Sequence, residues 1–107
     1  MLFKNVSIAG LAHIDAPHRL SSADINAQLQ PTMDRLGIKT DVLQDIAGIY
    51  ARRLWDDEVQ ASDAATLAAE KAIADAGIDR AKIGLLVNTS VSRDFLEPST
   101  ASIVSGN

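Results

Sequence analysis

The stretch that decides the fold is IGLLVNTSVSRDFLEPSTASIVSGN, which fills residues 83–107. Its first five residues carry no strongly polar side chain, a pattern typical of a strand covered on both faces in a parallel sheet. A polar tip, Asn88-Thr89-Ser90, follows, and then a charged loop and a helix that opens at Pro98. Because ligands of open α/β sheets gather beyond the carboxyl ends of the strands, we expect any chemistry at this tip and loop.

The composition limits what the chain can do. Its 107 residues, 47% of them hydrophobic, make one domain or part of one and can bury a core. The 14 acidic side chains outnumber the 10 basic ones and no basic cluster occurs, so nucleic acid is not an expected partner. The absence of cysteine excludes disulfides, thiolate metal sites and a Cys nucleophile from these residues. With no signal peptide and no run long enough for a membrane span, we expect a soluble cytoplasmic protein.

The N-terminal residues predict a strand and a loop. Small and apolar residues alternate over 6–12, and Gly10 within this strand indicates a bulge or a close backbone approach. His13 and His18 fall in the loop that follows. Two histidines five residues apart around a proline are a poor metal pair, so we interpret both as solvated loop residues.

The middle of the chain predicts a helix, a short helical turn and a second strand. A cap at residues 21–22 begins the helix, Pro31 interrupts or restarts it, and Gly37 ends its apolar stripe. A short turn of helix is expected over 41–46, and residues 49–55 are typical of a partly exposed strand.

The clearest helix is predicted over residues 62–76, with Ser62 as its cap and Gly77 at its end. Alanines recur on it at three-and-four spacing, and this smooth stripe lets the helix lie very near its neighbour. With the strand at 49–55 before it and the strand at 83–87 after it, the helix completes a right-handed crossover unit. We therefore expect an α/β fold with a mixed sheet and flanking helices.

Four motifs, in this order along the chain, resemble the first part of a β-ketoacyl-ACP synthase III. They are Gly48-Ile49 before a strand with Arg52-Arg53, an alanine-rich helix ending Ala76-Gly77-Ile78, the run at 84–90, and Glu97-Pro98-Ser99-Thr100-Ala101. Such proteins are condensing enzymes of the thiolase superfamily. The resemblance looks closest to the branch that joins two fatty acyl-CoA molecules head to head in olefin biosynthesis. It covers nearly the whole chain but only about the first third of such an enzyme.

The resemblance implies that residues 1–107 form the N-terminal part of a thiolase-like αβαβα fold that pairs as a homodimer. It implies Claisen condensation of fatty acyl thioesters, carried by CoA or by acyl carrier protein, in fatty acid or long-chain olefin biosynthesis. The family's catalytic Cys, His and Asn fall outside these 107 residues, so we expect the chain alone to be inactive. We expect neither a metal nor a cofactor.

One catalytic position remains within the chain. On the resemblance, Glu97 is the base that readies the second acyl chain, and Phe95 and Leu96 line the acyl pocket of the partner subunit beside it. A carboxylate in an apolar pocket loses hydration and gains basicity. The alternative is an acidic residue favoured by a helix N-terminus. Ile46 and Val42 replace the Arg and Trp that hold CoA in acetyl-CoA-using enzymes, which favours the long-chain branch.

Two other interpretations stay open. The chain could be a catalytically inactive truncated product, or an α/β binding module that uses the Asn88-Thr89-Ser90 tip. The serines near this tip lack a nearby histidine and a G-x-S-x-G motif, so we interpret them as capping and loop residues rather than nucleophiles. The acidic run at 56–58 is interpreted as a solvated surface.

Overall fold

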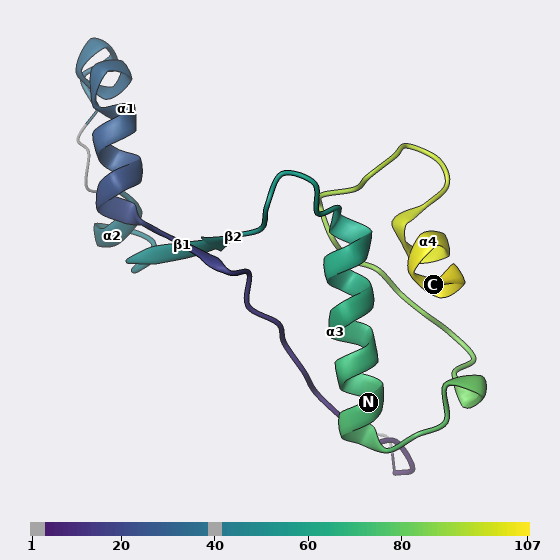
Figure 1. Cartoon of the computed structure of the whole chain (residues 1–107). Coiled ribbons are helices and arrows are strands. Elements are labelled where there is room, and N and C mark those ends of the chain that lie inside the picture. Colours follow the sequence, from purple (N-terminus) through teal and green to yellow (C-terminus); the bar gives the residue numbers. More distant parts are fainter. Residues whose placement is uncertain (1–3, 39–41) are drawn as a thin grey trace. The chain divides into compact units, whose positions relative to one another are not determined.

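The computed structural model describes residues 4–38 and 42–107, which divide into two compact units. One unit joins the residues up to Ile14 with residues 57–107, and the other consists of residues 15–56. Figure 1 shows the elements coloured along the chain. In order, they are β1 His18–Ser21, α1 Ser22–Leu36, α2 Val42–Asp45, β2 Ala51–Leu54, α3 Ala61–Ala76, the 3-10 helix η1 Arg80–Lys82, and α4 Thr100–Gly106.

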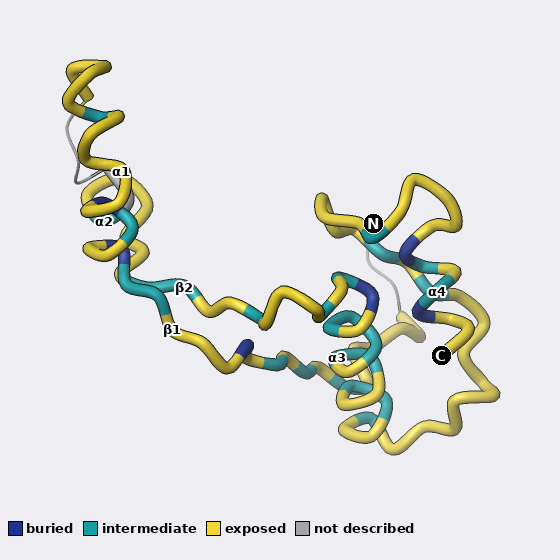
Figure 2. The backbone as a smooth tube through the Cα atoms, turned by 45° about the horizontal axis from the view of Figure 1, so that its top comes forward, coloured by how far each residue is buried: buried dark blue, intermediate teal, exposed yellow. Residues whose placement is uncertain are grey.

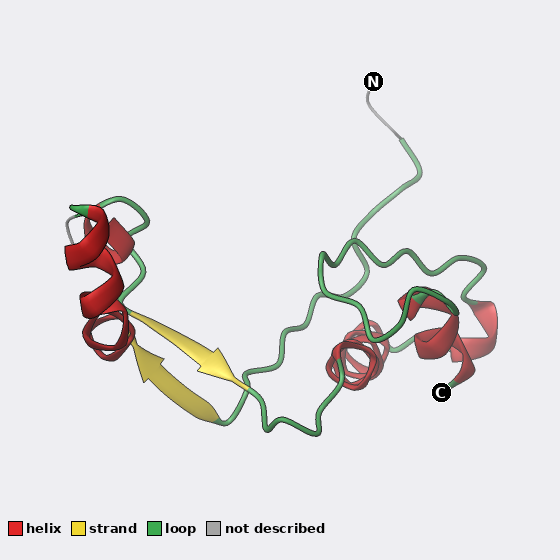
Figure 3. Ribbon diagram, turned by 90° about the horizontal axis from the view of Figure 1, so that it is seen from above, coloured by secondary structure: helices red, strands yellow, loops and turns green. Residues whose placement is uncertain are grey.

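The sheet of the 15–56 unit is an antiparallel pair formed by β1 and β2 (Figure 3). His18 lies opposite Leu54, and Ser21 lies opposite Ala51. The prediction that His18 belongs to a loop is therefore wrong. The ladder with β2 draws this residue into a strand, and its Nε2 lies 2.6 Å from a carboxylate oxygen of Asp56, the first residue of the acidic run.

Helix α1 begins and ends as the sequence predicts. Ser21 caps it by accepting the Asp24 N–H at 3.0 Å, and Gly37 ends it in the left-handed conformation at φ 66°. The predicted interruption at Pro31 is wrong, because a single helix continues through this residue. Proline leaves the Ala27 carbonyl without its helical donor, but Ala27 is exposed, so water can take that bond.

The short helix and the second strand are both present. The turn expected over 41–46 is α2, although Asp41 lies outside the described residues. The strand expected over 49–55 is β2, which is shorter at both ends. The Tyr50 carbonyl, just before β2, accepts the Ser22 N–H at 2.9 Å and so ties the start of α1 to the sheet.

Helix α3 dominates the other unit. It starts at Ala61, one residue earlier than predicted, so Ser62 lies inside the helix and the prediction that it is the cap is wrong. The cap position belongs to Gln60, whose N–H donates to the Asp63 carboxylate at 2.9 Å. The predicted end at Gly77 is confirmed, with φ 62°.

The N-terminal segment lies along α3. A Cβ atom at Gly10 would come within 2.8 Å of the Ala72 carbonyl oxygen and of the Ala76 backbone nitrogen. The Leu11 N–H donates to Asp75 at 3.2 Å, and Lys71 donates to the His13 carbonyl at 2.9 Å. The close backbone approach expected at Gly10 is confirmed, and the small residues on α3 make it possible.

The strands expected at 6–12 and 83–87 are not formed. Both segments are described, and both lie outside the β1–β2 ladder. Figure 2 colours the chain by burial. Both segments expose apolar side chains, such as Ile8 at 86% and Leu85 at 80%. A strand exists only where a neighbouring strand accepts and donates its backbone hydrogen bonds, and no described residues form such a neighbour for these two segments. The expected crossover unit and mixed sheet are therefore absent from the described residues, which nonetheless combine helices with a sheet, as an α/β chain does.

Candidate functional site

The polar tip expected to begin the site is a turn held by its own side chains. The Ser90 N–H donates to Asn88 Oδ1 at 3.1 Å, and the Ser90 hydroxyl donates to the Ser92 carbonyl at 2.9 Å. The first bond is typical of an Asx turn, in which a short side chain replaces a backbone acceptor, whereas in the second the serine hydroxyl donates to a backbone carbonyl of the same loop. Ser90 therefore makes loop hydrogen bonds, as the sequence predicts for it.

The loop after the tip is attached to the N-terminal end of α3. The carboxylate of Asp94 accepts the backbone N–H of Ser62, with distances of 3.2 Å to Oδ1 and 3.3 Å to Oδ2. Ser62 is buried and sits in the first turn of α3, where backbone N–H groups lack helical partners. Asp94 therefore supplies α3 with a capping acceptor from about thirty residues further along the chain.

The far end of the loop is attached to the same helix through α4. Ser99 caps α4 and accepts the Ser102 N–H at 3.3 Å, and Pro98 lies before this cap rather than within the helix. Thr100 and Val104 are buried, and α4 packs on α3. The peptide bond between Glu97 and Pro98 is cis.

The expected site residues lie between these two attachments, on the outside of the loop. Phe95 is 58% exposed and Leu96 is 76% exposed, and Glu97 beside them is exposed as well. Among the hydrogen bonds of the described part of the chain, none involves the Glu97 carboxylate. The loop thus presents two apolar side chains and a carboxylate together, at a surface that this unit leaves open.

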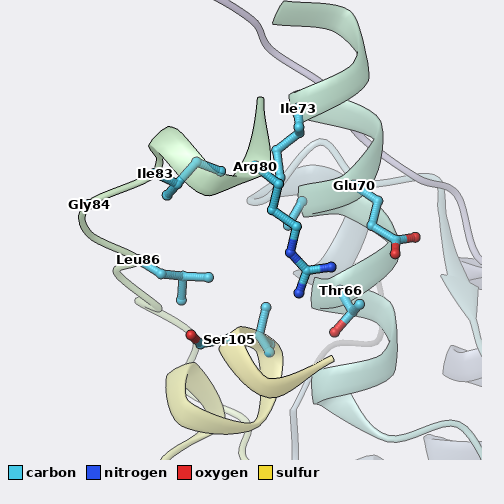
Figure 4. A pocket seen from close by; sticks show the side chains of 10 residues that line it. Thr66, Glu70, Ile73, Arg80, Ile83, Gly84, Leu86 and Ser105 are labelled. Carbon is cyan, nitrogen blue, oxygen red and sulfur yellow. The ribbon is translucent and has the colours of Figure 1, made fainter. Parts of the chain in front are cut away.

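A cavity of about 250 Å³ lies elsewhere in the same unit, between α3, η1, residues 83–86 and α4 (Figure 4). Arg80 and Glu70 are its charged lining residues, and Ile73, Leu86 and Val104 are among its apolar ones. None of these lining residues was among the site residues predicted from the sequence. The Arg80 guanidinium donates to the Asn107 carbonyl at 3.3 Å, at the C-terminal end of α4. The structure does not bring Phe95, Leu96 or Glu97 into this space.

Residues 4–38 and 42–107 contain neither a membrane-spanning helix nor a cluster of metal-ligating side chains. No helix there has the length and apolar character that crossing a bilayer requires. No group of three or more histidine, aspartate or glutamate side chains there could hold a metal ion.

Comparison with known proteins shows what the chain is related to. It is 78% identical over all 107 residues to an acyl-CoA:acyl-CoA alkyltransferase of Xanthomonas campestris pv. campestris, of which it covers 32%. It is 42% identical to a protein of the same description from Shewanella oneidensis, over 94% of this chain and 29% of that protein. Its homologues are condensing enzymes of the thiolase superfamily. The resemblance expected from the sequence motifs is thereby confirmed, although no family model matches the chain.

Solved structures confirm the fold. The chain matches a 3-oxoacyl-(acyl carrier protein) synthase III from Xanthomonas oryzae pv. oryzae with a TM-score of 0.86 and 79% identity, over 99% of this chain and 31% of that one. It matches cerulenin-bound OleA of Xanthomonas campestris with a TM-score of 0.86 and 78% identity, over the same shares. The chain therefore has the structure of the N-terminal portion of a thiolase fold and spans about a third of the length of these relatives.

Proposed function

We propose that the chain is the N-terminal portion of an enzyme that joins two fatty acyl thioesters by Claisen condensation, acting as a homodimer in the cytoplasm. The observation that carries this proposal is the 78% identity, over every residue of the chain, to a protein described as an acyl-CoA:acyl-CoA alkyltransferase. The chain covers 32% of that protein and contains no cysteine, so the proposed activity belongs to a longer enzyme that supplies the nucleophile.

In the proposed reaction, the first acyl group is held as a thioester on the enzyme. The α carbon of the second acyl thioester loses a proton and attacks the carbonyl carbon of the first. A carbon–carbon bond forms, the enzyme's carbon–sulfur bond breaks, and the thiolate leaves with the bonding electrons. The product is a β-keto thioester. We assign the removal of the α proton to Glu97, since a carboxylate is a competent base once an apolar pocket has stripped its hydration.

The loop geometry supports this role for Glu97. Phe95 and Leu96 expose apolar area directly beside the carboxylate, which suits insertion into the acyl pocket of a partner subunit. Two OleA structures that carry a replaced glutamate are 77% identical to this chain, whereas those with a replaced histidine are 78% identical. One additional mismatch inside the matched region gives a difference of this size, which supports placing the replaced glutamate of OleA within the part that this chain matches.

The test is the Glu97→Gln substitution in the longer enzyme. Glutamine keeps the size of the side chain but cannot accept the α proton. The rate of β-keto product formation from two acyl-CoA molecules should therefore fall on the order of a hundredfold to ten-thousandfold. The control is Glu58→Gln, which changes an exposed glutamate in the turn before α3 and should leave the rate unchanged.

Three outcomes would contradict separate parts of the proposal. Equal rates for the Glu97→Gln and Glu58→Gln enzymes would remove Glu97 from the chemistry. An unmodified enzyme that forms no carbon–carbon bond between two acyl groups would overturn the reaction itself. A monomer in sedimentation at catalytic concentrations would rule out insertion of the loop into a partner subunit.

A further inference from the structure

The loop that carries Glu97 is attached to α3 by charge-assisted hydrogen bonding as well as by packing. Both carboxylate oxygens of Asp94 lie within 3.3 Å of one backbone nitrogen, that of Ser62, in the first turn of a 16-residue helix. A hydrogen bond from a backbone N–H to an ionised carboxylate is about twice as strong as one between neutral groups. The positive end of the helix dipole adds to the attraction.

The loop is held at both ends by one rigid element. Asp94 fixes its start at the N-terminal end of α3, and the burial of Thr100 and Val104 fixes its end through α4. Figure 1 shows the loop leaving the N-terminal end of α3 and arching over to α4. Only residues 95–99 lie between the two attachments, so the path open to Glu97 is short.

We propose that Asp94 is a positioning residue that holds the 95–98 segment, and with it the Glu97 carboxylate, in place for proton removal. This proposal rests on the function proposed above for Glu97. A base must lie within about 3 Å of the proton that it removes, and a displacement of about 1 Å can cost a hundredfold in rate. Glu97 follows Asp94 by three residues, so release of Asp94 would let the carboxylate move by more than that.

The chain contains a matched control for this proposal. Asp63 also caps the N-terminal end of α3, because its carboxylate accepts the Gln60 N–H at 2.9 Å, but it is bound to no residue of the 88–99 loop. Asp63→Ala and Asp94→Ala each remove one capping carboxylate from the same helix. Only Asp94→Ala also frees the loop.

The anchoring is tested on the 107-residue chain by limited chymotrypsin digestion. Phe95 is exposed, and cleavage after it requires the loop to adapt to the protease. The rate of this cleavage, followed by mass spectrometry, should rise at least fivefold in Asp94→Ala and stay near the unmodified rate in Asp63→Ala. Asp94→Asn keeps one acceptor oxygen for the Ser62 N–H, so its cleavage rate should lie between those of Asp94→Ala and Asp63→Ala. Equal cleavage rates in all four proteins would overturn the anchoring.

The effect on catalysis is tested in the longer enzyme. Asp94→Ala should lower kcat on the order of tenfold to a hundredfold while KM stays near its original value, since the acyl pocket itself is unchanged. Asp94→Asn should recover most of the lost rate. Asp63→Ala should lower the thermal midpoint by about as much as Asp94→Ala does, but it should leave kcat unchanged.

The outcomes separate the two proposals. An unmodified enzyme without condensation activity contradicts the proposed function, while the digestion of the 107-residue chain still decides the anchoring. An active enzyme in which Asp94→Ala and Asp63→Ala have the same kcat contradicts the positioning role alone. A loss of kcat that Asp94→Asn does not reduce would also count against it.

Discussion

Two apolar stretches of this chain, α3 and residues 83–87, differ in how far they pack against other segments. Helix α3 has a run of alanines, and it packs against both the N-terminal segment and α4. Residues 83–87 are more hydrophobic than α3, yet Leu85 is 80% exposed and Val87 is exposed as well. The less hydrophobic stretch is therefore the one that packs.

The difference shows what each kind of element needs from the rest of the protein. A helix makes its backbone hydrogen bonds within itself, so α3 forms once its ends are capped and then offers a finished surface for packing. A strand leaves its N–H and C=O groups unpaired until another strand lies beside it. Residues 4–38 and 42–107 supply caps for α3 but no neighbouring strand for residues 83–87.

The largest loss of stability in this comparison is expected at Gly10, where the N-terminal segment packs against α3. Gly10→Ala would place a methyl group 2.8 Å from α3 backbone atoms, which cannot give way as a flexible side chain could. We expect it to lower the free energy of unfolding by about 2 kcal/mol in a urea titration. Gly84→Ala is the matched control, because a Cβ there would meet no atom of the described residues within 4 Å. Equal effects at the two glycines would show that the close approach at Gly10 is not maintained in solution.

A smaller effect is expected where α3 ends. Gly77 holds φ at 62°, a conformation that an L side chain disfavours. Gly77→Ala should therefore cost about 1 kcal/mol of unfolding free energy, measured by the same titration. Gly106→Ala, at the end of α4 and outside the left-handed region, should cost nothing. A cost at Gly106 as large as that at Gly77 would contradict the assignment of the loss to backbone conformation.

The smallest loss of stability is expected at Leu85, in the exposed stretch at 83–87. Leu85→Ser removes an apolar side chain that already faces solvent in this chain, so the unfolding free energy should change by no more than about 0.5 kcal/mol. In the longer enzyme proposed above, we expect residues 83–87 to form a strand buried on both faces, where the same change would cost about 3 kcal/mol. A large loss in the 107-residue chain would mean that residues 83–87 are packed there after all.

The sequence predicted the helices well because the signals that begin and end them are local. Ser21, Gly37 and Gly77 act as predicted, and the spacing of the alanines correctly indicated that a neighbour packs closely on α3. The errors at Pro31 and Ser62 have a common cause. Both rules concern a single backbone group whose partner is not a neighbour in sequence. At Pro31 the group is the Ala27 carbonyl, on a residue that is exposed to solvent, and at Ser62 it is the Ser62 N–H, which donates to Asp94.

The site divides in the same way. The motif around Glu97 and the resemblance that it carries identified the loop, and the homologues confirm the resemblance. The anchoring by Asp94 left no local signal, because its partner Ser62 is 32 residues away. An aspartate before Phe95 is indistinguishable in sequence from any other charged loop residue. The role of Glu97 itself remains a prediction.

The sequence by itself determined that Ser21 caps α1, that α1 and α3 end at Gly37 and Gly77, and which enzymes the chain is related to, because caps, alanine spacing and motifs are written in neighbouring residues. Only the tertiary structure decided that Gly10 meets α3 and that Asp94 caps it. It also showed that Leu85 and Val87, in the apolar stretch at 83–87, are exposed. Those outcomes depend on which distant segments come together, since a backbone N–H or an apolar face is satisfied only by whatever lies against it in space.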